Sequence, residues 1–227
     1  MNARPLTIAV DEGHRVSGVL HVPAKPSGSA LVLAHGAGND MTAPLLVAVA
    51  EGLAARGVTV LRFNFLYKEL GKKAPDARLL LELVYRAAIE AMRARKPKRL
   101  FVGGKSMGGR VASMLAAKGA ACDGLVFLGY PLHPAGKPEK LRQTHLSDIK
   151  APMLFLEGTR DALCDLALLR PVLARLGDRA AMHVVDGGDH SFDLLKSAAR
   201  TRESVHAEII TAIHAWIAER SRPAKAR

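Results

Sequence analysis

Cysteine and aromatic residues are scarce in this sequence, and their scarcity argues against several classes of protein. Of its 227 residues, two are cysteines, Cys122 and Cys164, and 4% are aromatic. Two cysteines make no disulfide framework, and neither they nor the spacing of histidines and carboxylates predicts a metal site or a cofactor. So few aromatic side chains provide no platform on which nucleotide bases stack.

Long apolar runs are also missing. Residues 1–7 hold no apolar core of a secretory signal. The apolar stretch 44–55 is interrupted by Glu51 and Gly52 and is too short to span a bilayer. We therefore expect a cytoplasmic protein that does not enter a membrane.

Acidic residues are outnumbered, with 21 Asp and Glu against 33 Lys and Arg, a net charge of +12. The basic residues are dispersed along expected helices such as 78–95. The densest cluster, 93–99, falls where a helix should end, and cations there stabilise the helix dipole. Charge of this kind does not specify a partner, so we expect no nucleic-acid partner.

Short apolar runs alternate with amphipathic segments over the whole length. This alternation predicts a parallel sheet covered by helices on both faces. We expect one α/β domain over 1–227 with about 7–8 strands and a basic, flexible tail at 220–227. The expected strands are 6–10, 16–22, 30–34, 58–63, 99–103, 124–128, 152–156 and 181–185; the expected helices are 43–56, 75–95, 111–118, 165–176 and 197–220.

The segment 104–108, Gly-Lys-Ser-Met-Gly, is the most informative in the chain. It joins an expected strand to an expected helix, which is the context of a nucleophile elbow, a sharp turn that exposes a serine hydroxyl. Small residues must flank such a serine, and Gly104, Gly108 and Gly109 leave that space. The segment predicts Ser106 as a nucleophile; an ordinary buried turn serine is the alternative.

A serine nucleophile needs a base, and the base needs an acid that orients it. Catalytic groups in parallel sheets gather at the carboxyl ends of strands. Asp161 follows the strand 152–156, and His190 follows the strand 181–185. Together with Ser106 they predict a triad in the order Ser, Asp, His.

Other roles remain open for several of these residues. Asp161 is also placed to cap a helix, and Asp165 is a rival acid that fits a helix N-cap better. Asp189 is expected in a turn. Four histidines are expected at the periphery: His145, His183, His206 and His214.

An oxyanion hole needs two backbone N–H donors. Met107, directly after the nucleophile, should provide one. The segment 35–38, His-Gly-Ala-Gly, follows the strand 30–34 and is similar to the oxyanion loop of lipases and esterases. Within it Ala37 is the preferred second donor and Gly36 the alternative.

Candidate substrate-binding residues are His35, Lys105 and His133. A scaffold role for His35 and a plain loop role for His133 are equally open. Lys105, with the lysines at 68, 72 and 73, is placed to rim the pocket and favour acidic esters; solvated lysines without a role in binding are the alternative.

Segments along nearly the whole chain resemble small α/β-hydrolases of the dienelactone-hydrolase-like branch, which includes KANL/Tex-like hydrolases. The resemblance implies a serine hydrolase core with poorly defined substrates, and some animal relatives act within chromatin assemblies. Dienelactone hydrolases proper have a cysteine where this chain has Ser106. The segments that carry the resemblance are 35–38, 62–65, 104–110, 129–132, 158–161 and 189–192.

These observations predict a carboxylesterase that acts on small soluble esters through an acyl-enzyme on Ser106. Only residues 131–150 separate the sixth strand from the strand before Asp161, so no cap domain is expected. A catalytically silent interaction protein with the same fold, and a serine acyltransferase or peptidase, are the alternatives. The oligomeric state is left open.

Overall fold

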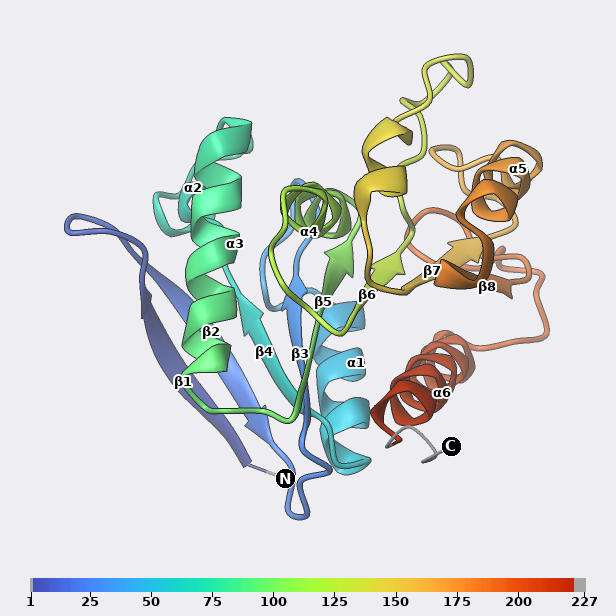
Figure 1. The fold of residues 1–227 in the computed structure, drawn as a ribbon. Helices are drawn as coiled ribbons and strands as arrows, with labels where there is room; N and C mark the ends of the chain where they lie inside the picture. The colour runs from blue at the N-terminus through green and yellow to red at the C-terminus, as the bar shows by residue number, and fades with distance from the viewer. Residues whose placement is uncertain (1, 223–227) are drawn as a thin grey trace, which may run out of the picture.

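One mixed sheet organises the computed structural model, which describes residues 2–222 (Figure 1). Its eight strands lie in the order β1-β2-β4-β3-β5-β6-β7-β8. β2 pairs antiparallel with β1 and β4, and all other pairings are parallel, which confirms the expected mostly parallel sheet. The strands are β1 (Asn2–Ala9), β2 (Arg15–Val22), β3 (Ser29–Ala34), β4 (Thr59–Phe63), β5 (Arg99–Lys105), β6 (Gly124–Leu128), β7 (Met153–Gly158) and β8 (Ala180–Val185).

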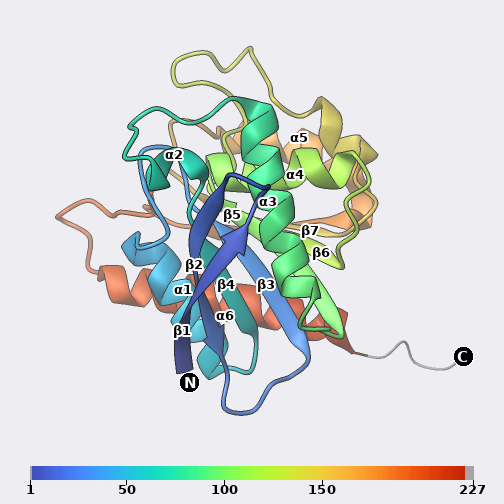
Figure 2. The same ribbon diagram turned by 90° about the vertical axis from the view of Figure 1, so that its left-hand side faces the viewer.

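Helices cover both faces of the sheet (Figures 1 and 2). α1 and α6 pack on one face, and α3, α4 and α5 on the other, so the apolar core divides into two layers. The helical elements are α1 (Pro44–Ala55), α2 (Leu66–Glu69), α3 (Arg78–Arg93), α4 (Met107–Ala117), η1 (Thr144–Asp148), α5 (Leu166–Leu176), η2 (Gly177–Arg179) and α6 (Arg202–Ser221).

The position of each strand in the sheet follows from its sequence. Every residue of β3, β6 and β7 is buried, as continuous apolar runs predict for strands covered on both faces. β1 lies at the edge, and most of its residues are exposed. The residues that carry chemistry therefore extend from the carboxyl ends of the most buried strands.

Two helices start later than the sequence predicts. The segment 75–95 forms helix only from the first residue of α3, because the Asp76 carboxylate accepts a hydrogen bond from the Tyr67 amide and holds the preceding loop. The segment 197–220 forms helix only from the residue after Thr201, whose side chain caps α6. A capping side chain therefore sets the start of α6, whereas the residue before α3, Ala77, has no side-chain cap.

The C-terminal end of α6 also differs from expectation. The flexible tail expected at 220–227 begins inside α6, since its first two residues are still helical. The part of that tail beyond residue 222 lies outside the described residues.

The connection between β6 and β7 contains one short helix, η1, and no cap domain, as expected. His145 in η1 is not peripheral, which corrects the sequence-based expectation. Its Nε2 lies 2.8 Å from the Ser113 hydroxyl, and burial lowers its pKa. This contact fastens η1 to α4.

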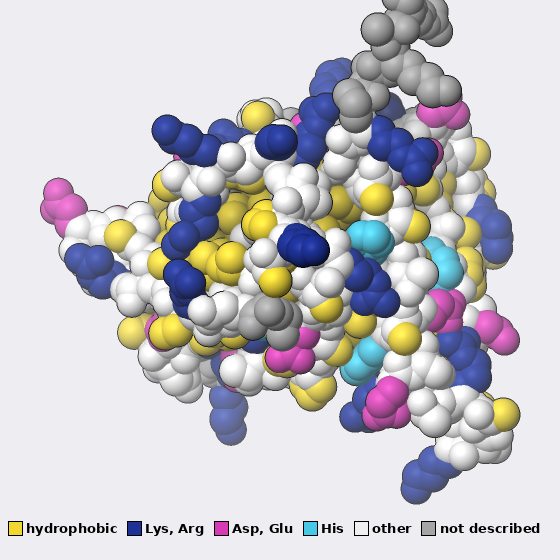
Figure 3. Space-filling view, turned by 90° about the horizontal axis from the view of Figure 1, so that it is seen from below, with side chains coloured by type: hydrophobic (Ala, Val, Ile, Leu, Met, Phe, Trp, Pro, Cys, Tyr) yellow, Lys and Arg dark blue, Asp and Glu magenta, His cyan; other side chains and the backbone are white. Residues whose placement is uncertain are grey.

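On the face of the molecule that is seen from below in Figure 3, basic side chains are spread out rather than gathered in one patch. Across residues 2–222, no helix combines the length and apolar character that crossing a membrane requires.

Candidate active site

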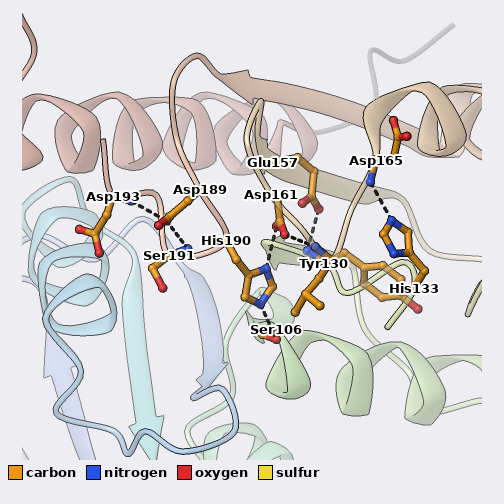
Figure 4. A network of polar contacts seen from close by, with 11 residues as sticks. Ser106, Tyr130, His133, Glu157, Asp161, Asp165, Asp189, His190, Ser191 and Asp193 are labelled. Atoms are coloured by element: carbon orange, nitrogen blue, oxygen red, sulfur yellow. Dashed lines mark hydrogen bonds and ion pairs between the residues drawn. The ribbon is translucent and has the colours of Figure 1, made fainter. Parts of the chain in front are cut away.

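Ser106, His190 and Asp161 meet at the carboxyl edge of the sheet (Figure 4). His190 Nε2 lies 2.8 Å from Ser106 Oγ, and His190 Nδ1 lies 2.7 Å from Asp161 Oδ2. With its proton on Nδ1, the imidazole donates to the carboxylate and accepts from the serine hydroxyl. The three residues follow β5, β7 and β8, so the structure brings together the groups that the sequence singled out.

A strained turn holds the serine. Ser106 has φ 50° and ψ −111°, a backbone conformation that L-residues rarely adopt. A Cβ at Gly104 would lie 2.4 Å from the carbonyl oxygen of Ala34, and one at Gly108 would lie 2.6 Å from the same atom. These contacts explain why glycines must flank the nucleophile.

Asp161 is held through both carboxylate oxygens. Oδ2 faces His190, Oδ1 accepts the Leu163 amide at 2.7 Å, and none of the side chain is exposed. The rival acid, Asp165, caps α5 instead: its Oδ1 accepts the Ala167 amide at 2.8 Å. The geometry therefore places Asp161, and not Asp165, behind the histidine.

His133 holds the loop that carries the acid. Its Nδ1 donates to the Pro134 carbonyl at 3.0 Å, and its Nε2 accepts the Asp165 amide at 3.1 Å. The side chain is buried and both ring nitrogens are occupied. Of the two roles left open for His133, these contacts favour the loop role over contact with substrate.

His35 is a scaffold of the glycine-rich loop after β3. Its Nδ1 donates to the Gly36 carbonyl at 2.8 Å, and its Nε2 accepts the Phe65 amide at 3.1 Å. The ring is fully buried, and burial lowers its pKa, so it stays neutral. Of the two roles left open, scaffold and substrate contact, the first is correct.

The predicted oxyanion donors lie around Ser106. A Cβ at Gly36 would lie 3.5 Å from Ser106 Cβ, so this loop passes directly beside the nucleophile. Met107 is the first residue of α4, where an amide has no acceptor within the helix. Gly36 and Ala37 both remain available as the second donor.

Sequence reasoning missed Glu157, which lies beside Asp161 (Figure 4). It is fully buried; its Oε1 accepts the Tyr130 amide at 2.7 Å, whereas its Oε2 has no partner within residues 2–222. Burial raises its pKa well above the usual range, which favours the neutral form of the carboxyl group. A carboxyl directly after the apolar run 152–156 was the available signal.

The lysines expected at the pocket rim separate into two groups. Lys105 is 8% exposed and lines a cavity beside the elbow. Lys72 and Lys73 are exposed, and neither they nor Lys68 line that cavity. The described residues contain no cluster of three or more His, Cys, Asp or Glu side chains arranged to hold a metal ion.

Comparison with known proteins agrees with this architecture. A family model described as an alpha/beta hydrolase domain matches residues 27–218. The structure is similar to a dienelactone hydrolase from Anabaena variabilis, with 20% identity over 96% of this chain and 97% of that one and a TM-score of 0.75. It is also similar to an α/β serine hydrolase without a lid from Xanthomonas campestris, with 21% identity, coverage of 99% and 97%, and a TM-score of 0.74. An esterase from Pyrococcus furiosus matches with 18% identity, coverage of 96% and 92%, and a TM-score of 0.73. At these identities the solved structures establish the fold.

Proposed function

The chain belongs to the α/β-hydrolase family, and on that premise we propose that it is a serine carboxylesterase that acts on small soluble esters. One observation carries the proposal: the unbroken hydrogen-bonded chain from Ser106 through His190 to Asp161. A hydroxyl paired with a neutral imidazole, itself oriented by a carboxylate, is the arrangement that activates serine near neutral pH.

The reaction begins when Ser106 Oγ attacks the ester carbonyl and His190 Nε2 takes its proton. Asp161 holds the imidazole in the required tautomer and stabilises the imidazolium that forms. The Met107 amide and one amide of the loop after β3 bind the oxyanion.

The tetrahedral intermediate then expels the alcohol, which takes the proton from His190 and leaves an acyl group on Ser106. Water, deprotonated by His190, attacks this acyl-enzyme and releases the acid. Without a cap domain between β6 and β7, a small ester reaches the site directly from solvent.

Labelling with a fluorophosphonate probe tests this proposal. Wild type should react covalently, Ser106→Ala should not, and Ser147→Ala, which removes an exposed serine in η1, should react like wild type. Ester hydrolysis should fall on the order of 10⁶-fold in Ser106→Ala. A folded wild type that takes up no probe would favour a catalytically silent interaction protein.

Product analysis separates the remaining alternatives. An added alcohol or amine should not divert the acyl group from water, and peptides should not be cleaved. Efficient transfer to an added acceptor would identify an acyltransferase instead.

A further inference from the structure

A cavity of about 210 Å³ opens beside the nucleophile elbow. We call it the side cavity. One part of it is lined by Gly36 of the oxyanion loop, by Lys105, which precedes Ser106, and by Ser191, which follows His190. Its volume is below the range of about 300–1,000 Å³ of drug-sized sites, which suits a small polar group.

Lys105 contributes an ammonium group on a largely buried side chain. The side chain is 8% exposed and forms no hydrogen bond or salt bridge with residues 2–222. Burial of the side chain lowers the pKa of Lys105 to about 8. At neutral pH the ammonium is present with its donors unused.

The carboxyl groups around Lys105 are engaged elsewhere. Asp161 accepts from His190 and Leu163, and Asp189 accepts the amides of Ser191 and Asp193. Glu157 accepts the Tyr130 amide through Oε1, and burial raises its pKa, which favours the neutral carboxyl. Their charges favour the ammonium form at longer range, but none of them fills its hydrogen bonds.

The first turn of α1 adds a second positive element to the side cavity. Pro44, Leu45 and Leu46 line it. Pro44 has no N–H, and the N-cap residue, Ala43, has no side chain that accepts from the amides of Leu45 and Leu46. The free amides and the positive end of the dipole of this twelve-residue helix favour an anion there.

The remaining charged groups in the wall leave an excess of positive charge. Arg202 and Asp193 both line the side cavity and pair at 2.9 Å, so their charges largely offset one another. His206 also lines it, and burial together with Arg202 lowers its pKa. Near neutral pH, Lys105 is therefore the cation of the described wall that forms no salt bridge.

We propose that the side cavity binds the carboxylate of an anionic ester whose scissile carbonyl lies at Ser106. The proposal rests on the esterase function proposed above. One uncompensated lysine matches a monoanion better than a doubly charged phosphate. The substrate class is a small ester that carries a free carboxylate a few bonds from the reacting carbonyl, such as a half-ester of a short dicarboxylic acid.

A pair of isosteric esters tests the proposal. Mono-p-nitrophenyl glutarate carries the carboxylate, and p-nitrophenyl 5-methylhexanoate replaces its two oxygens by methyl groups. Wild type should prefer the anionic ester in kcat/KM. Lys105→Met should lower that preference about 10- to 100-fold, the range for hydrogen bonds to charged groups. The exposed-lysine controls Lys72→Gln and Lys73→Gln should leave it unchanged.

Equal losses on both esters in Lys105→Met would overturn the proposal. So would an unchanged preference. Asp193→Asn supplies a second test that does not depend on how Lys105→Met folds, because it removes the one carboxylate in the described cavity wall. It should raise the preference for the anionic ester, and a fall would contradict the proposal.

The pH dependence gives a readout that a structural role would not move. The preference of wild type should decline as pH rises through about 8, where Lys105 loses its proton. Dividing the kcat/KM of one ester by that of the other cancels the pH effects on catalytic steps that both esters share. A preference that stays constant across this range would overturn the assignment to Lys105.

Binding without turnover separates this inference from the proposed function. Glutarate should bind to Ser106→Ala in isothermal titration calorimetry, and Lys105→Met in that background should abolish binding. If no ester is hydrolysed but glutarate binds in this way, the esterase proposal fails and the anion site stands. No binding of glutarate overturns the anion site.

Discussion

The acid loop, residues 158–165, and the side cavity flank the same nucleophile but treat their polar groups in opposite ways. In the acid loop the carboxylates of Asp161 and Asp165 both accept hydrogen bonds, and His133 Nε2 accepts the Asp165 amide. In the side cavity Lys105 and the first turn of α1 have no partner within the described residues.

This difference separates two functions of polar groups, orientation of a proton and binding of a ligand. Groups that orient a proton must not move, so their bonds are completed inside the protein. Groups that bind a ligand keep bonding capacity free, and the ligand recovers the desolvation cost. Around this elbow, groups with complete hydrogen bonding are therefore those that orient a proton, and groups with free bonding capacity are those that bind a ligand.

The largest effect on activity should come from a substitution in the acid loop, where the hydrogen bonds are complete. Asp161→Asn should keep the bond from the Leu163 amide, and thus the fold, but lose the carboxylate that fixes the tautomer of His190. We expect kcat for ester hydrolysis to fall about 10⁴-fold. Asp165→Asn is the matched control and should retain kcat. If Asp165→Asn is instead the more damaged variant, the assignment of the acid is wrong.

The second effect concerns the elbow that separates the two regions. In Gly104→Ala the new Cβ would lie 2.4 Å from the Ala34 carbonyl oxygen and 2.9 Å from the carbonyl carbon of Gly108. Neither backbone atom can withdraw, so we expect a loss of about 3 kcal/mol in the free energy of unfolding. Gly13→Ala, with no atom closer than 3.9 Å, should be nearly neutral in the same denaturant titration. Equal stability of the two variants would show that the elbow is less tightly packed than these contacts require.

Glu157 allows a smaller test, on stability. Its pKa is raised in the folded state, so above the ordinary pKa the unfolded chain loses the proton that the folded chain keeps. Stability should therefore decrease as pH rises above the ordinary carboxyl pKa, by up to about 1.4 kcal/mol per unit. Glu157→Gln keeps an acceptor for the Tyr130 amide and should remove this slope in urea titrations. An unchanged slope in the variant would place its origin in another group.

The sequence was sufficient to predict the sheet and the triad because each depends on local pattern. Apolar runs separated by helical segments give the strands, and Ser106, Asp161 and His190 each follow a strand in the required order. Carboxyl ends of parallel strands lie at one edge, so order along the chain becomes proximity in space.

The supporting contacts could not be predicted, because they join segments far apart in sequence. His133 reaches the amide of Asp165, and Glu157 reaches that of Tyr130. A loop histidine and a strand-end carboxyl look alike in sequence whether they bind substrate or hold a neighbouring loop. The partnerless state of Lys105 is equally invisible, since it depends on every side chain around it.

The smallest effect should appear where a completed bond has no part in proton transfer. Asp165→Ala removes the cap of α5 and should cost about 1 kcal/mol in the free energy of unfolding. Because His133 binds the Asp165 backbone amide rather than its side chain, the loop should keep its place and kcat should not change. Asp165→Ser, which restores a capping hydroxyl, should recover most of the stability. If kcat falls in Asp165→Ala and returns in Asp165→Ser, the cap itself holds Asp161 in register, and completed bonds beyond those of the triad contribute to catalysis.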